Sequence, residues 1–156
     1  MIVLLAEMQL EISIPSDNEG YILLQCEYCG TLFKVLTKDL HDERLLNIFC
    51  PCCGLVSDNY LTDEVMSLAN AMVENFVQDE ILKMFKKFEK KSRNSLIQIK
   101  AGKRATRLDE APIKTGIDAL EITEFKCCER FAKIKPLLKI TGCYCPFCGV
   151  KVYEIE

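Results

Sequence analysis

The stretch CEYCG at residues 26–30 is followed by CPCCG at residues 50–54, which gives the spacing C-x2-C…C-x2-C with 20 residues between the pairs. Each pair can turn two sulfurs inward around a tight turn, and the glycine after it lets the backbone curl so that amides approach the sulfurs. Two such turns supply four thiolates, the ligand set of a tetrahedral metal site. We therefore predict one metal site formed by Cys26, Cys29, Cys50 and Cys53.

A second group of cysteines lies near the end of the sequence. CPFCG at residues 145–149 repeats CPCCG at residues 50–54, which indicates an internal duplication. The first pair of this group is irregular: when FKV at 33–35 is aligned with AKI at 132–134, Cys128 takes the place of Cys29, but Phe125 takes the place of Cys26. Glu129 stands where the first group has its glycine.

One ligand of the second group must therefore come from another position, and Cys127 and Cys143 are the two candidates. Cys143 aligns with the apolar Ile48 and could instead fill a core position. Cys127 is favoured, although two adjacent residues can converge on one ion only in a turn and not in a regular strand. The predicted second site consists of Cys127, Cys128, Cys145 and Cys148.

Residues 21–56 resemble the paired knuckles of zinc-ribbon and rubredoxin-like proteins, with Gly30, Pro51 and Gly54 at the family's positions. The resemblance implies a fold and a metal but no task. Because all four ligands are thiolates and leave no open position, we expect two structural Zn²⁺ ions, although the same cage accepts iron in rubredoxins.

Two further residues near the first site are expected to stay off the metal. Cys52 aligns with Phe147 and should point away from the ion, and His41, the single histidine, lies among polar residues. A lone histidine without a nucleophile motif, a phosphate loop or an HExxH pair argues against an enzyme. A redox dithiol is disfavoured because each CxxC pair has partners that complete a metal cage.

The chain of 156 residues, 49% of them apolar, can bury one ordinary core or two small ones. Its ten cysteines would suit a secreted disulfide scaffold, but the apolar start at residues 1–6 is too short for a signal peptide or a membrane span and has no basic region before it. We expect a soluble, cytoplasmic protein that does not bind membranes.

The predicted fold is α+β, with two small β zinc-ribbon modules joined by a long amphipathic helix and a basic linker. Residues 10–14 and 21–24 suggest a leading β-hairpin, and strand patterns recur at 119–125, 131–134 and 150–155. The helix is expected at about residues 62–91, with Thr62 as its N-cap and an apolar stripe from Val65 to Phe88. The expected divisions are 1–60 for the first ribbon, 61–93 for the helix, 94–118 for the linker and 119–156 for the second ribbon.

Charge is strongly segregated, at −11 over residues 1–82, +9 over 83–107 and −1 over 108–156. The basic segment could neutralise several phosphates, so binding of nucleic acid is the first functional hypothesis. Its competitor is a solvated helix face that balances the acidic part of the chain. The residues assigned to this role are Lys83, Lys86, Lys87, Lys90, Lys91, Arg93, Lys100, Lys103, Arg104 and Arg107.

The alternative hypothesis is a protein-interaction adaptor that uses the ribbon edges and the apolar stripe of the helix, which could also pair with a second copy. Overall acidity and the shortage of exposed aromatic residues interleaved with the basic ones favour this alternative. The pattern of residues leaves open which partner binds, the oligomeric state, and whether the two modules touch.

Overall fold

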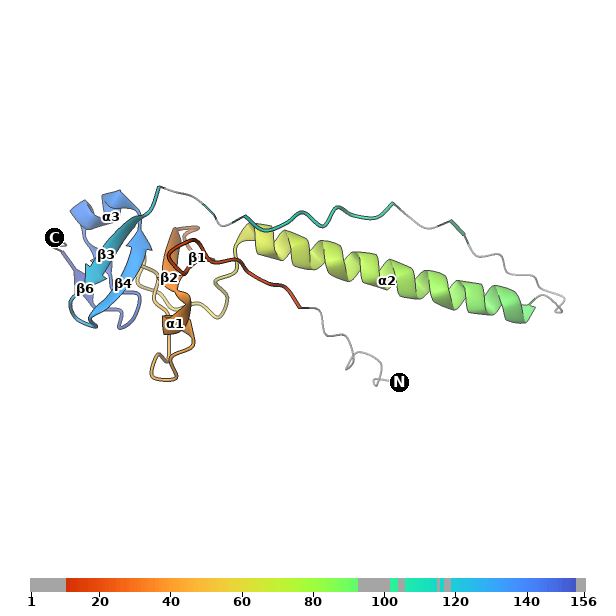
Figure 1. Ribbon diagram of the computed structural model, residues 1–156, viewed down its shortest axis with the longest axis horizontal. Coiled ribbons are helices and arrows are strands. Elements are labelled where there is room, and N and C mark those ends of the chain that lie inside the picture. The colour runs from red at the N-terminus through yellow and green to blue at the C-terminus, as the bar shows by residue number, and fades with distance from the viewer. Residues whose placement is uncertain (1–10, 93–101, 104–105, 115, 117–118, 154–156) are drawn as a thin grey trace. The chain divides into compact units, whose positions relative to one another are not determined.

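The computed structural model describes residues 11–92, 102–103, 106–114, 116 and 119–153, with the backbone alone at 91–92. The chain divides into two compact units (Figure 1). One contains residues 1–12 and 66–112, and the other contains residues 13–65 and 113–156. Both cysteine groups belong to the second unit, which we call the β unit.

A four-stranded antiparallel sheet organises the β unit. Strands β1 (Tyr21–Gln25) and β2 (Leu32–Leu36) form one hairpin, and β3 (Glu121–Phe125) and β4 (Arg130–Ile134) form another. The hairpins join through β2 and β4, so the strand order is β1-β2-β4-β3. Segments expected as separate modules therefore share one sheet.

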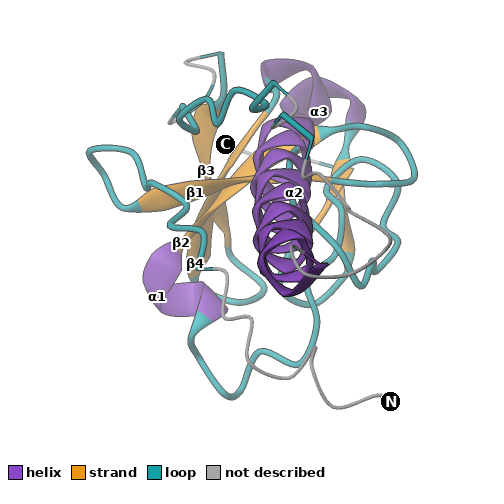
Figure 2. Cartoon of the chain, turned by 90° about the vertical axis from the view of Figure 1, so that its right-hand side faces the viewer, coloured by secondary structure: helices purple, strands orange, loops and turns teal. Residues whose placement is uncertain are grey.

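Shorter elements complete the β unit (Figure 2). Helix α1 (Thr37–Leu40) follows β2, and helix α3 (Pro136–Thr141) follows β4. Strands β5 (Cys143–Tyr144) and β6 (Lys151–Val152) pair with each other around the second CPxCG-type loop.

The junction of β2 and β4 relates the two halves of the β unit by an approximate two-fold axis. Lys34 pairs with Lys133, and Val35 pairs with Ala132. Lys34 and Lys133 are also equivalent positions in the alignment of the two segments. An antiparallel pair of equivalent residues requires a two-fold relation between their strands, so each half packs on the other like a subunit of a symmetric dimer.

The core of the β unit lies across this junction. Phe33 and Val35 of β2 and Ala132 and Ile134 of β4 are fully buried, together with Phe125 of β3. Phe125 also contacts Phe147 edge to face, with ring centroids 6.3 Å apart. Both halves therefore contribute to one hydrophobic core.

The expected strand at residues 10–14 is wrong for the residues that the structure describes, because 11–16 form no strand and β1 pairs with β2 instead. Asp17 determines this difference. Its carboxylate accepts backbone hydrogen bonds from Glu19 and Tyr21, which makes a local turn, and it also accepts from the buried Lys34 and Lys133. The segment before β1 is thus anchored by charge and not by strand pairing.

Helix α2 spans Asp63–Ser92, close to the expected range. The hydroxyl of Thr62 accepts a hydrogen bond from the backbone amide of Val65 at 3.4 Å, the geometry of an N-cap. No helix among the described residues has an apolar stretch long enough to cross a bilayer.

Candidate metal centres

The first cysteine pair sits in the turn between β1 and β2. The amide of Cys26 donates to the carbonyl of Thr31, and the amide of Gly30 donates to the carbonyl of Cys26. Gly30 has φ +67°, a left-handed conformation that glycine adopts without strain. This curled turn places the sulfurs of Cys26 and Cys29 on the same side.

The second pair repeats the same hydrogen bonds in the loop after residue 49. The amide of Cys50 donates to the carbonyl of Leu55, and the amide of Gly54 donates to the carbonyl of Cys50. Sulfur distances of 3.7 Å from Cys26 to Cys53 and 3.5 Å from Cys29 to Cys50 bring the four thiols together.

The second group assembles from equivalent elements. The loop at residues 145–149 has the same two hydrogen bonds, from Cys145 to Val150 and from Gly149 to Cys145. Between β3 and β4, Glu129 takes a left-handed φ of 51° where the first half has Gly30. The alignment of the irregular pair is therefore consistent with the backbone geometry, although glutamate is strained in this conformation.

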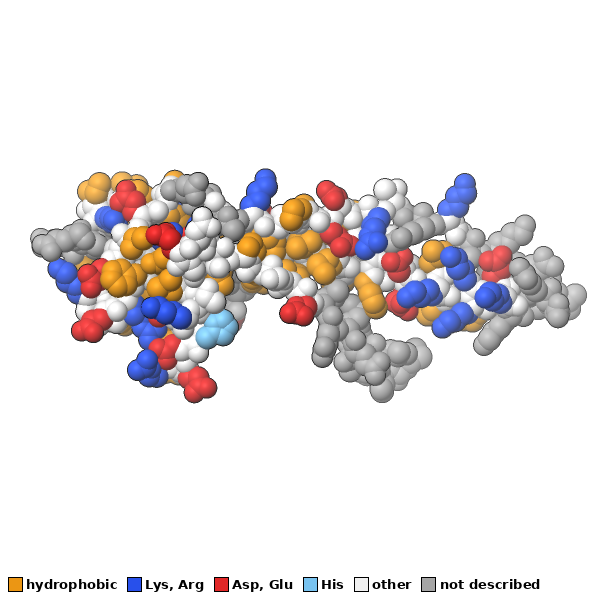
Figure 3. Space-filling view, viewed as in Figure 1, with side chains coloured by type: hydrophobic (Ala, Val, Ile, Leu, Met, Phe, Trp, Pro, Cys, Tyr) orange, Lys and Arg blue, Asp and Glu red, His pale blue; other side chains and the backbone are white. Residues whose placement is uncertain are grey.

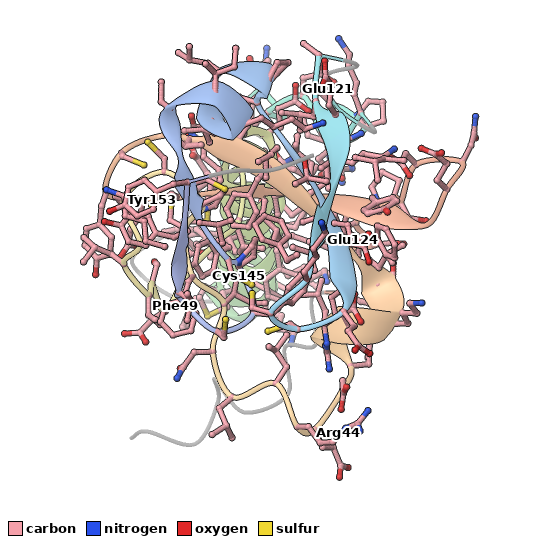
Figure 4. All side chains as sticks on the ribbon, turned by 90° about the vertical axis from the view of Figure 1, so that its left-hand side faces the viewer. Arg44, Phe49, Glu121, Glu124, Cys145 and Tyr153 are labelled. Carbon is pink, nitrogen blue, oxygen red and sulfur yellow. The ribbon has the colours of Figure 1, made fainter. Side chains whose placement is uncertain are left out.

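This turn brings adjacent cysteines to one place. The sulfur of Cys128 lies 3.9 Å from that of Cys145, and the sulfur of Cys127 lies 3.6 Å from that of Cys148. Figure 4 shows sulfur atoms gathered near Cys145. Cys127 thus joins the group, as the sequence analysis favoured.

Both groups have the dimensions of a tetrahedral thiolate site. Within each group the four sulfurs lie within 4.8 Å of one another. A tetrahedron with metal–sulfur bonds of about 2.3 Å has sulfur–sulfur edges of about 3.8 Å, close to the distances above. Each group could therefore hold one metal ion with all four ligands from the protein.

Cys143, the other candidate ligand, is not part of the second cysteine group. It is fully buried in β5 within the hydrophobic core, and burial raises its pKa to about 11. Cys52 is exposed and contributes only its backbone amide, which donates to the sulfur of Cys50 at 3.4 Å. His41 is exposed and its Nδ1 contacts the carbonyl of Thr37 at 2.8 Å.

The thiols within each group differ in the direction in which their pKa values are shifted. Burial raises the pKa of Cys50 and of Cys145, although amides of the following residues donate to both sulfurs. Burial also acts to raise the pKa of Cys29, but hydrogen bonds with Thr31, Cys50 and Cys26 together outweigh it and lower this pKa to about 6. Thr31, whose hydroxyl lies 3.3 Å from that sulfur, is a supporting residue that the spacing of cysteines did not reveal.

The two loops that carry Cys50 and Cys145 also hold each other. The amide of Phe49 donates to the carbonyl of Pro146, and the amide of Tyr144 donates to the carbonyl of Pro51, both at 2.9 Å. These are equivalent contacts under the two-fold relation. The loops of the two cysteine groups therefore pack against each other.

The aromatic rings next to these loops also make equivalent contacts in the two halves of the β unit. A Cβ at Gly149 would come within 2.7 Å of the ring of Phe49, and a Cβ at Gly54 within 2.8 Å of the ring of Tyr144. Both glycines therefore serve two purposes, a left-handed turn and space for the aromatic ring of the other half.

Of the residues predicted to bind nucleic acid, the structure places Lys83, Lys86, Lys87 and Lys90 as exposed side chains on α2. Lys83 forms an ion pair with Glu80. Lys103 and Arg107 lie after α2 in the described residues 102–103 and 106–112, called the return segment below, where Arg107 pairs with Glu110. The remaining predicted positions lie outside the described side chains: Lys91, Arg93, Lys100 and Arg104.

Comparison of the chain with models of known families, with curated proteins and with solved structures gave no match. Function is therefore inferred from the chain's own residues and geometry.

Proposed function

We propose that this protein is a non-enzymatic binding protein, in which two structural zinc ions hold the β unit together and helix α2 recognises a protein partner. The observation that carries this proposal is a row of apolar side chains left exposed along α2. Zinc is the proposed metal because closed sites of four thiolates suit its tetrahedral preference.

The exposed row, called the exposed stripe below, occupies one face of α2. Its members recur at helical spacing, and Met84 and Phe88 near its end are 50% and 55% exposed. The stripe consists of Met66, Val73, Val77, Ile81, Met84 and Phe88.

The opposite face of α2 is already covered. Asn75 is almost fully buried, and its amide nitrogen donates to the carbonyl of Leu108 while its oxygen accepts from the amide of the same residue, both at 2.9 Å. Glu110 accepts a further hydrogen bond from Asn75 at 2.8 Å. These contacts tie the return segment to the side of α2 that lies opposite the exposed stripe.

A capture experiment tests this proposal. Tagged protein would be confirmed by elemental analysis to carry two zinc ions, then used to capture proteins from a lysate treated with nuclease. We expect Ile81→Glu to abolish capture of a defined partner, and Ser67→Glu, an exposed polar position on the same helix, to retain it. Equal capture by both variants would refute an interaction through the stripe.

Chelation tests the structural role of zinc. Because metal binding in small thiolate sites supplies folding free energy, on the order of 10 kcal/mol, removing the metal should unfold the β unit. Circular dichroism that stays unchanged after verified metal loss would refute this role.

Binding of nucleic acid is the second candidate. One observation favours it: a hollow of about 540 Å³ beside α2 is lined by three lysines, Lys83, Lys86 and Lys103, together with Asp79, Leu82 and Gly102. Retention of RNA or DNA that falls with salt and is lost in Lys86→Glu would support it. No retention at low salt would remove it.

A further inference from the structure

Five of the six residues of the exposed stripe, all but Met84, have a spacing that reads the same in both directions. Met66, Val73, Val77, Ile81 and Phe88 are separated by seven, four, four and seven residues, with Val77 at the centre. These separations keep the five side chains on one helix face over about 33 Å, at 1.5 Å per residue. A two-fold axis through Val77 would therefore match these five positions with one another.

Charge along α2 changes sign shortly after this centre, between Glu80 and Lys83. Residues 63–80 contain five acidic and no basic side chains, whereas residues 81–92 contain five lysines and one glutamate. Figure 3 shows the blue side chains gathered toward the C-terminal end of the helix. Two copies in parallel would place the lysine-rich halves together, whereas an antiparallel pair places each basic half beside an acidic one.

We propose that the partner of the exposed stripe is the same helix of a second copy, paired antiparallel about Val77. In this arrangement Met66 lies against the partner's Phe88, and Val73 lies against the partner's Ile81. Knobs of this size at helical spacing form the seam of two-stranded helix pairs. This inference rests on the proposed function, since it names the protein that the stripe binds.

Self-association is the first measurement. Zinc-loaded full-length protein should sediment as a dimer in the range of about 1 to 100 μM. Val77→Glu places two carboxylates at the two-fold axis and should raise the dissociation constant by about 30-fold or more, because a buried apolar contact is lost and like charges meet. Ser67→Glu adds the same charge away from the stripe and should remain dimeric. Zinc content and circular dichroism establish that both variants are folded.

Orientation is the second measurement. A photo-crosslinking benzophenone amino acid replaces Phe88, and isotope-labelled and unlabelled chains are mixed so that crosslinks between copies are identified by mass spectrometry. Crosslinks to the peptide that contains Met66 of the other copy support the antiparallel pair. Crosslinks between copies at residue 88 overturn it, because they indicate parallel helices. A crosslink within one chain to residues 1–10 also overturns it, because that apolar segment would then be the occupant.

The two proposals fail in different ways. A chain that stays monomeric at the highest concentration overturns self-pairing. If Ile81→Glu nevertheless abolishes capture of another protein, the interaction function stands with a different partner. If the stripe variants change neither association nor capture, both proposals fall.

Discussion

Loss of metal from one thiolate group should weaken metal binding at the other. The perturbation is Cys127→Ala combined with Cys148→Ala, which removes two ligands of the second group. Both side chains are exposed, so their truncation leaves no cavity in the core. Without its metal, the loop at residues 145–149 loses the constraint that holds it against the loop at residues 50–54.

The expected magnitude follows from the contacts between these loops. Two backbone hydrogen bonds join them, one from Phe49 to Pro146 and one from Tyr144 to Pro51. Each contributes about 1 kcal/mol net, so complete loosening removes about 2 kcal/mol of support from the remaining group. This corresponds to a decrease of about 30-fold in its metal affinity.

The assay is a competition titration with a chelator, using Co²⁺ as an optical reporter of thiolate coordination. Cys52→Ala is the matched control, because that thiol is exposed and belongs to neither group. The reciprocal variant, Cys29→Ala with Cys53→Ala, should weaken the second group by a similar factor. An affinity at the intact group that stays within about twofold of the wild-type value would refute the reasoning, since it would assign the loop contacts less than about 0.4 kcal/mol.

Four further substitutions test the local geometry by chemical denaturation of the zinc-loaded protein. Gly149→Ala should lower the free energy of unfolding by about 2 kcal/mol, because the new Cβ meets the ring of Phe49 and the backbone is left-handed. Gly30→Ala has open space around the new Cβ and should cost only the backbone strain of about 1 kcal/mol. Equal losses in the two variants would contradict the ring contact. Glu129→Gly should stabilise by about 1 kcal/mol by relieving its left-handed φ, and no gain would show that the turn is unstrained. Asp17→Asn should cost about 3 kcal/mol because the buried Lys34 loses its carboxylate and the buried Lys133 keeps only Glu19, and a loss below about 1 kcal/mol would refute that role.

The two cysteine groups could be predicted because the sequence pattern that marks them is local. Four thiols in two short turns need particular residues at fixed separations, and those residues stand together in the sequence. The N-cap of α2 was predictable for the same reason, since Thr62 acts on an amide three residues away. The strands around the second group could be placed approximately from their alternating patterns, and the structure has β3 and β4 there.

The pairing of the two hairpins could not be predicted, because it joins residues about one hundred positions apart. Lys34 and Lys133 form the centre of this junction, and both are charged residues that a pattern assigns to a solvent face. They are buried because Asp17 bonds to both, with Glu19 a further partner of Lys133. An ion pair of this kind has no periodic signature.

One ligand of the second cysteine group comes from a different position than in the first group, because the two halves of the β unit share one core. Phe125 occupies the position equivalent to Cys26, and at 1% exposure it packs against Phe147 in the centre of that core. A thiol there would leave a large part of the ring's volume empty, so a ligand must come from the turn that follows. Cys127 supplies it from the surface, and the left-handed Glu129 lets the turn bend far enough for two adjacent sulfurs to converge. The irregular spacing that obscures the second group in the sequence thus fits a core that is filled from both halves of the β unit.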